Sequence, residues 1–200
     1  MTRKMTLLLA SNNKHKVIEI KSILKNRFDK IVTLEEEGIV CNPEENGTTF
    51  YDNALIKATE VAKYTSYTVL ADDTGLCVDA LNGEPGTHSA RYSGDHDNAK
   101  NRAKLLEKLK NTNNRTAHFE TAVVLRFPNG QVISASGRVD GYILKEEQGT
   151  NGFGYDSIFY SNELAKCFGI ATDEEKNSVS HRARALQSLV NKLEESKLQN

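Results

Sequence analysis

The stretch VLADDTG, residues 69–75, ends an apolar run in two adjacent aspartates followed by a sequence typical of a turn. Two carboxylates about 4 Å apart repel by about 4 kcal/mol at the effective dielectric constant of a protein surface. Solvent around an exposed Asp-Asp-Thr-Gly turn would offset this repulsion, and so would a bound divalent cation. The stretch alone favours a plain turn, so the choice between the two depends on the rest of the chain.

The sequence before this stretch alternates between strand-like and helix-like patterns. Residues 5–10 and 30–34 are short apolar runs typical of strands, and residues 67–71 form a third. Helical spacing of apolar residues starts at Lys14 and again at Phe50. The order strand, helix, strand, helix, strand indicates an α/β sheet covered by helices.

A different pattern follows. Residues 117–127 alternate apolar and polar, and the turn sequence Pro-Asn-Gly at 128–130 leads into a second such run, which predicts an antiparallel hairpin. Asp97 is the expected cap of a helix before it. The apolar residues expected on buried helix faces are Ala103, Leu106 and Leu109, and in a long last helix Val179, Ala183, Leu186, Val190 and Leu193. We therefore predict one domain over residues 1–200, with a long central mixed sheet flanked by helices and two lobes around an active-site cleft.

Composition excludes several classes of protein. A chain of 200 residues with 38% hydrophobic content is long enough for a compact core without staples. The three cysteines have neither zinc-site nor disulfide-framework spacing, which favours a reducing cytoplasm. The net charge is −1 with no basic arm, so we expect no nucleic-acid partner. No apolar stretch is long enough to span a bilayer, so we expect no membrane association.

The loop SNNKHK, residues 11–16, follows the first predicted strand and opens the first helix. Free backbone N–H groups and the helix dipole favour an anion at such a point, and Lys16 adds a positive charge. The alternative is a simple Ser or Asn cap with exposed lysines. The chain has no Walker loop and no G-x-G-x-x-G, so any nucleotide site uses another fingerprint.

Two further segments carry candidate residues. In EENGTTFYDNALIKA, Glu44 and Glu45 precede a helix whose apolar face carries Lys57. The Lys57 side chain either lays its aliphatic stem along that face and keeps its ammonium in water, or points into a cleft. In GTNGFGYD, glycines surround Phe153, which could stack on a base while Asp156 accepts from ring N–H donors. The alternative for the second segment is a Gly-rich turn with its Phe in the core.

The segment TDEEKNSVSHRARAL opens the last helix. Thr172 and Glu175 fit a capping box, and Lys176, His181 and Arg182 follow closely. A His-Arg pair at a helix start is usually solvated. Here it lies opposite the apolar stripe of the predicted helix.

Taken together, the motifs resemble a known family. LASNNKHK, TFYDNALIKA, VLADDTGL, PGTHSARYSG, GFGYDSIF and EEKNSVSHRARAL occur in the order and at about the spacing seen in the inosine triphosphatase family, over residues 7–189. These are pyrophosphatases that clear non-canonical purine nucleoside triphosphates, ITP, dITP, XTP and dXTP, from the nucleotide pool. The resemblance implies hydrolysis to the monophosphate and pyrophosphate, a two-lobed α/β fold, a homodimer and a required Mg²⁺.

The resemblance also implies roles for individual residues. Asp73 would be the general base and, with Glu45 or less favourably Glu44, a metal ligand, while Asp72 would support the turn. Residues expected to hold the triphosphate are Ser11, Asn12, Asn13, Lys14, His15, Lys16 and Lys57. Thr74 would make a substrate contact. The base would be framed by Phe153, Gly154, Tyr155 and Asp156, and its edge would be contacted by Lys176, His181 and Arg182.

The sequence departs from the family pattern at two points. Thr74 stands where many relatives have Ser, and SNNKHK replaces the commoner Thr-Gly-Asn opening, although both keep a hydroxyl and the lysine. Two rival functions are a pyrophosphatase for modified pyrimidine or canonical nucleotides and a non-catalytic nucleotide-sensing or RNA-binding module. The retained FGYD and SHR motifs argue against the first, and the absence of a basic face argues against the second.

Overall fold

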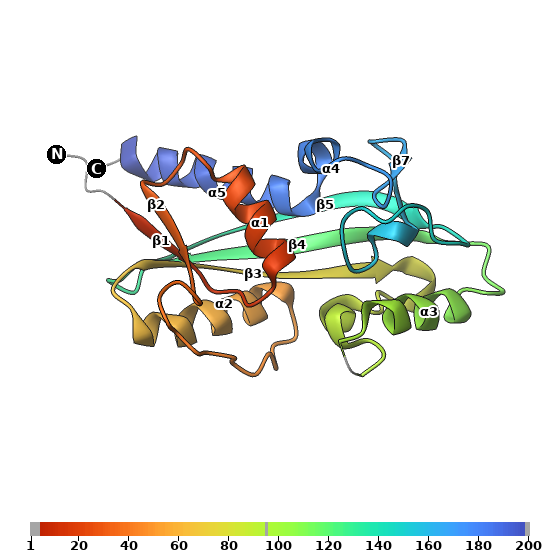
Figure 1. The fold of residues 1–200 in the computed structure, drawn as a ribbon, viewed down its shortest axis with the longest axis horizontal. Coiled ribbons are helices and arrows are strands. Elements are labelled where there is room, and N and C mark those ends of the chain that lie inside the picture. Colours follow the sequence, from red (N-terminus) through yellow and green to blue (C-terminus); the bar gives the residue numbers. More distant parts are fainter. Residues whose placement is uncertain (1–4, 95, 199–200) are drawn as a thin grey trace. The chain divides into compact units, whose positions relative to one another are not determined.

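The computed structural model describes residues 5–94 and 96–198. Its strands form one seven-stranded sheet in the order β2-β1-β3-β4-β5-β6-β7. The strands are β1 (Thr6–Leu9), β2 (Lys30–Thr33), β3 (Thr68–Val78), β4 (Thr116–Arg126), β5 (Val132–Ile143), β6 (Phe159–Ser161) and β7 (Lys166–Cys167). The α-helices, labelled in Figure 1, are α1 (Lys14–Ile23), α2 (Phe50–Val61), α3 (Asn98–Lys108), α4 (Asp173–Val179) and α5 (His181–Leu198). Short 3₁₀ helices are η1 (Ala62–Tyr64), η2 (Asp79–Leu81), η3 (Gly86–Arg91) and η4 (Asp156–Ile158).

The sheet is mixed. β1 lies parallel to β2 and to β3, with Leu8 paired to Val32 on one side and to Val69 on the other. Parallel neighbours need a crossover connection, and α1 and α2 provide it. β6 runs antiparallel to both β5 and β7. The predicted α/β fold with a central mixed sheet flanked by helices is therefore confirmed.

The chain divides into two compact units. The first unit comprises Met1–Asp73, Thr121–Gly137 and Arg182–Asn200, and the second comprises Thr74–Glu120 and Arg138–His181. Each unit is described by itself below. A single domain over residues 1–200 and a cleft between lobes both stay predictions.

The first unit packs helices on both faces of its strands (Figure 1). Leu7 and Leu9 of β1 belong to an apolar cluster with residues of α1 and α5, whereas Leu8 belongs to a cluster with residues of α2. Successive side chains of a strand point to opposite faces, so α1 and α5 cover one face and α2 covers the other. All three leucines are fully buried, which is why this strand is an uninterrupted apolar run.

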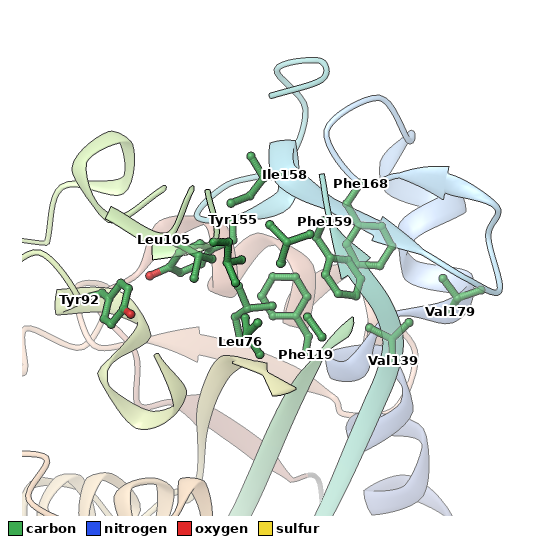
Figure 2. Packing of buried hydrophobic residues seen from close by; sticks show 14 residues of the cluster. Leu76, Tyr92, Leu105, Phe119, Val139, Tyr155, Ile158, Phe159, Phe168 and Val179 are labelled. Atoms are coloured by element: carbon green, nitrogen blue, oxygen red, sulfur yellow. The ribbon is translucent and has the colours of Figure 1, made fainter. Parts of the chain in front are cut away.

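The second unit has an aromatic core, shown in Figure 2. The ring centroid of Phe159 lies 4.7 Å from that of Phe119 and 5.2 Å from that of Phe168. Leu105 of α3 and Val179 of α4 join the same buried cluster. β4, β6, α3 and α4 all contribute to this cluster, and Tyr155 and Ile158 anchor in it the end of the segment that enters β6.

The turn predicted at residues 72–75 is wrong. These residues lie inside β3, which continues to Val78. The exposed fractions of Asp72 and Asp73 are 2% and 6%, so solvent does not offset the repulsion between them. Oppositely charged side chains around each carboxylate do so instead, as described below.

Two helix predictions are corrected and one is confirmed. Asp97 caps α3, where its side chain accepts from the N–H of Lys100 at 3.0 Å. Ala103 was expected on the buried face but is exposed, because the face that packs inward carries Asn101 and Leu105. The single last helix expected from the apolar stripe is two helices.

The break between these two helices is at Ser180. Val179 ends α4, Ser180 is extended with φ −66° and ψ 152°, and α5 begins at His181. The predicted capping box is present, since Thr172 accepts from the N–H of Glu175 and the Glu175 side chain accepts from the N–H of Thr172. Among the described residues, no helix has the length and apolar character needed to cross a membrane.

Candidate active site

The loop between β1 and α1 places the first group of candidate residues in the first unit. Oδ1 of Asn13 accepts from the N–H groups of His15 and Lys16 at 3.0 and 3.2 Å, so Asn13 is the cap of α1. Oγ of Ser11 accepts from the N–H of Asn13 at 3.2 Å. The side chains of Lys14 and His15 are exposed, whereas that of Lys16 turns inward. A phosphate role for this loop stays a prediction.

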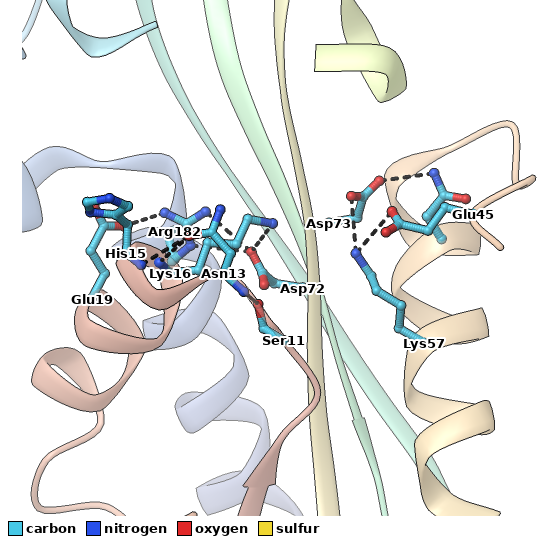
Figure 3. A network of polar contacts seen from close by, with 11 residues as sticks. Ser11, Asn13, His15, Lys16, Glu19, Glu45, Lys57, Asp72, Asp73 and Arg182 are labelled. Carbon is cyan, nitrogen blue, oxygen red and sulfur yellow. Dashed lines mark hydrogen bonds and ion pairs between the residues drawn. The ribbon is translucent and has the colours of Figure 1, made fainter. Parts of the chain in front are cut away.

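Lys16 points to Asp72, as Figure 3 shows. Its ammonium lies 3.1 Å from Oδ2 of Asp72, and Nε and Nη2 of Arg182 each donate to the same oxygen at 3.3 Å. Nη1 of Arg182 also donates to the carboxylate of Glu19 in α1. Asp72 is predicted from the sequence only to support a turn, but it is the buried carboxylate that joins α1, β3 and α5.

Burial and charge oppose each other in this cluster. Burial by itself would raise the pKa of Asp72, but the cations Lys16, Arg182 and Lys57 outweigh it and hold that pKa far below its usual range. Burial lowers the pKa of Lys16 despite the attraction of Asp72. Burial would also lower the pKa of Arg182, but Asp72 and Glu19 outweigh it and raise that pKa. The pairing therefore keeps the carboxylate ionised.

Asp73 points to the opposite side of β3, toward α2 (Figure 3). Its Oδ1 lies 3.3 Å from Nζ of Lys57, and the same ammonium lies 3.1 Å from Oε2 of Glu45. Lys57 therefore bridges the two carboxylates predicted to bind metal. Glu45 is half-buried and pairs with Lys57, whereas Glu44 is exposed. Of the two glutamates, Glu45 is therefore the better candidate for a metal ligand beside Asp73.

The electrostatics of this second cluster suit a proton acceptor. Burial and the nearby carboxylate of Glu45 raise the pKa of Asp73, against the opposing attraction of Lys57 and Lys16. For Lys57, burial would lower the pKa, but Asp73, Asp72 and Glu45 outweigh it and raise that pKa. A carboxylate with a raised pKa beside a fully charged lysine can take a proton in a reaction more readily than an ordinary aspartate.

Asn53 is a residue that the sequence reasoning missed. Its Nδ2 donates to Oδ2 of Asp73 at 3.1 Å, and its Oδ1 accepts from the N–H of Gly47 at 2.8 Å. A Cβ at Gly47 would lie 2.7 Å from that same Oδ1, so the contact requires glycine. The sequence carries one signal for this role of Asn53. It stands four residues before Lys57, so the two side chains lie on the same face of α2.

The residues present fit a divalent cation of the Mg²⁺ type. Glu45 and Asp73 offer two carboxylates held by one lysine, and Mg²⁺ is usually bound by one or two carboxylates, with phosphate oxygens and waters completing the shell. In the part of the chain that the structure describes, no group of three or more His, Cys, Asp or Glu side chains could hold a metal. Glu45 and Asp73 therefore supply only part of the coordination shell of such a cation.

The second unit holds the loop of residues 149–156. Oδ2 of Asp156 accepts from the N–H of Phe153 at 2.8 Å and lies 2.7 Å from Nζ of Lys176. The same ammonium lies 4.9 Å from the centroid of the Phe153 ring. Asp156 and Lys176 are buried, and Tyr155 is buried beside them. The structure thus brings Phe153, Asp156 and Lys176 together.

His181 and its sequence neighbour Arg182 belong to different units. His181 stacks on Phe119 in the second unit, with ring centroids 4.7 Å apart and an interplanar angle of 14°. Thr74 also lies in the second unit, in β3. Both His181 and Arg182 are buried, at 3% and 1% exposed, so this pair is not solvated as a His-Arg pair at a helix start usually is.

Arg182 belongs to the other unit. Its guanidinium donates to Asp72 and Glu19, among the residues around Lys16. The base-edge contact of Arg182 that the resemblance implies stays a prediction.

Comparison with known proteins places the chain in a family. Residues 7–192 match the sequence profile of the Ham1 family. The chain belongs to the Ham1 family. A dITP/XTP pyrophosphatase of Leuconostoc mesenteroides is 47% identical over 194 residues, covering 94% of this chain and 96% of that protein. A dITP/XTP pyrophosphatase of Clostridium perfringens is also 47% identical, over 93% of this chain and 96% of its own length.

A solved structure gives the same result for the fold. The Staphylococcus aureus Ham1 protein superposes with a TM-score of 0.85 at 39% identity, covering 96% of this chain and 99% of that chain. The resemblance drawn from six motifs is therefore confirmed for family and fold. The roles of individual residues in this Ham1-family chain stay predictions.

Proposed function

We propose that this protein hydrolyses the non-canonical purine nucleoside triphosphates ITP, dITP, XTP and dXTP to the monophosphate and pyrophosphate, clearing deaminated purines from the nucleotide pool. The names of its Ham1-family relatives support the substrate class. The observation that carries the chemistry is Asp73, a buried carboxylate held by Asn53 and Lys57 with Glu45 close by. That set matches what cleavage of a phosphoanhydride needs.

The reaction breaks the bond between the α and β phosphates. Asp73 takes the proton of the attacking water, and pyrophosphate leaves. Lys57 and Lys16 would each pair with a phosphate oxygen, and the polar side chains of residues 11–15 would contact the triphosphate. Glu45 and Asp73 would hold Mg²⁺, which when bound neutralises charge that develops on the leaving group.

We assign the base to the second unit. The Phe153 ring would stack on the purine, and Gly154, Tyr155 and Asp156 would frame it. Lys176 and His181 would contact the edge that carries the C6 oxygen, and Thr74 would contact the substrate nearby. Arg182 would contact the same edge, and its hydrogen bonds to Asp72 would orient its guanidinium.

A coupled assay tests the proposal. Inorganic pyrophosphatase is added, and phosphate release is measured across eight nucleoside triphosphates with Mg²⁺. We expect ITP, dITP, XTP and dXTP to be turned over and chromatography to show IMP from ITP. Accumulation of IDP and free phosphate, or a preference for pyrimidine or canonical nucleotides, would contradict it. Binding without turnover would favour the nucleotide-sensing alternative.

Two further parts of the proposal have their own measurements. A homodimer is expected, and light scattering of the purified chain would report its mass. Dependence on Mg²⁺ is expected too, so chelation should abolish turnover and added Mg²⁺ should restore it. A cytoplasmic location stays a prediction from the cysteine pattern.

A further inference from the structure

One ion pair of the second unit has no part in the function argued so far. Nη1 of Arg102, in α3, donates to the backbone carbonyl of Gly154 at 2.8 Å. Nε of Arg102 lies 3.0 Å from Oε1 of Glu147, and Oε2 of Glu147 accepts from Oγ of Ser157 at 2.9 Å. The pair therefore joins α3 to Gly154 in the loop of residues 149–156 and to Glu147 and Ser157, which flank that loop.

Two glycines of that loop have backbone conformations that other residues rarely adopt. Gly152 and Gly154 have φ values of +71° and +62°, in the left-handed region that glycine enters without steric cost. A Cβ at Gly154 would meet nothing within 4 Å, so the space on that side of the residue is open. Its carbonyl is held by the hydrogen bond from Arg102.

The residues on either side of Gly154 are held by other groups. The N–H of Phe153 donates to Asp156, and the hydroxyl of Tyr155 donates to the carbonyl of Ser89 at 2.8 Å. Arg102 thus provides the restraint on the one peptide between them. Its helix is itself fixed, because the neighbouring side chain of Asn101 is buried and binds the backbone of Ala90.

We propose that Arg102, oriented by Glu147, is a positioning residue that pre-organises the Phe153–Asp156 loop for the purine base and so contributes to base selection. The proposal rests on the proposed function, in which that loop frames the base. Arg102 contacts no substrate in this account and acts only through the Gly154 carbonyl. Without it the loop samples other glycine conformations, and binding has to select the competent one.

The pattern of kinetic change distinguishes this role from a purely structural one. Loss of a hydrogen bond from a charged donor lowers the population of the ordered loop conformation relative to the others by about tenfold or more, and the apparent affinity for the base falls with it. In Arg102→Met we therefore expect KM for ITP and the dissociation constant of IMP, measured by calorimetry, to rise about tenfold. We expect kcat to change by no more than about twofold, and the ratio of kcat/KM for ITP over ATP to narrow.

Two milder variants keep the test decisive if Arg102→Met folds poorly. Arg102→Lys keeps the charge and one donor, so its effects should be smaller and in the same direction. Glu147→Gln keeps an acceptor for Ser157 but loses the charge that orients the guanidinium, and it too should raise KM. The matched control is Arg138→Met, which breaks an exposed ion pair with Asp140 in the same unit, where the two side chains are 53% and 59% exposed.

Three outcomes would overturn the inference. The first is a KM and an IMP dissociation constant in Arg102→Met that equal those of Arg138→Met. The second is a loss of kcat with KM unchanged. The third is a KM that changes only in proportion to the fraction unfolded, measured by urea denaturation. The failure of the proposed function can be told apart from the failure of the inference. If the wild-type protein binds IMP but does not release pyrophosphate from ITP, the proposed function fails, and the calorimetry still tests Arg102. If the wild-type protein does both and the Arg102 variants do not differ from it, only the inference fails.

Discussion

Asp72 and Asp73 are neighbours in β3 whose carboxylates point to opposite sides of the strand, each toward its own lysine (Figure 3). Lys16 and Arg182 neutralise Asp72, and Lys57 neutralises Asp73. The strand continues through the pair because its alternation separates the two charges. Asp72 is thus paired with two cations, whereas Asp73 shares one lysine with the carboxylate of Glu45.

Asp73→Asn should abolish most turnover and leave the fold intact. The change keeps the shape of the side chain but removes the proton acceptor, and loss of a general base typically costs about 10² to 10⁴ in rate. The measurements are pyrophosphate release from ITP and the urea midpoint. A variant that retained more than about a tenth of wild-type turnover would show that Asp73 is not the base.

Asn53→Ala should weaken metal binding. Asn53 orients Asp73 and fixes the backbone at Gly47 near Glu45, and loss of such a supporting hydrogen bond typically costs about 10- to 100-fold in metal affinity. Calorimetric titration with Mg²⁺ would measure it. Glu60→Gln, in the exposed Glu60–Lys63 pair of the same segment, serves as the control. An unchanged affinity would mean that Asn53 only stabilises the fold.

Lys57→Met should change metal and substrate binding in opposite directions. In the structure the Lys57 ammonium bridges Glu45 and Asp73, so its removal leaves two carboxylates that attract a cation more strongly. We expect Mg²⁺ to bind about tenfold more tightly without nucleotide, roughly 1.4 kcal/mol, while KM for ITP rises. Weaker Mg²⁺ binding in this variant would show that Lys57 supports the metal site instead of competing for it.

Asp72→Asn should destabilise the first unit. The change leaves Lys16 and Arg182 buried without their shared carboxylate, and breaking a buried pair on one side typically costs about 3 to 5 kcal/mol. Urea unfolding would measure the loss. The control is Glu194→Gln, which breaks an exposed pair with Arg27 and should cost about 1 kcal/mol or less. Equal losses in the two variants would argue against a structural role for Asp72.

Gly152→Ala should damage the base loop. A Cβ there would lie 2.1 Å from Oδ2 of Asp156, so the carboxylate that binds Lys176 would have to move. Gly130→Ala is the control, since Gly130 also has a positive φ, +88°, but its Cβ would meet nothing within 4 Å. We expect KM for ITP to rise only in Gly152→Ala. A similar KM in both variants would mean that the loop tolerates displacement of Asp156.

Much of the fold is readable from local patterns. The apolar run of β1, the helical spacing from Lys14 and Phe50, and the hairpin around residues 128–130 each depend on neighbours in sequence. The same holds for the Asp97 cap and the Thr172 capping box, whose hydrogen bonds close within three residues. These features were predicted because the chain fixes them locally.

The amino-acid sequence is enough to identify the charged and reactive residues and the order of motifs that marks the family. Which of these residues contact one another follows from the folded chain alone. Asp72 pairs with Arg182 across 110 positions, and Asn53 reaches Asp73 across 20, distances over which no local pattern carries information. The turn expected at VLADDTG became strand for the same reason: the charges that permit two buried aspartates lie on α1, α2 and α5, and only folding brings them to β3.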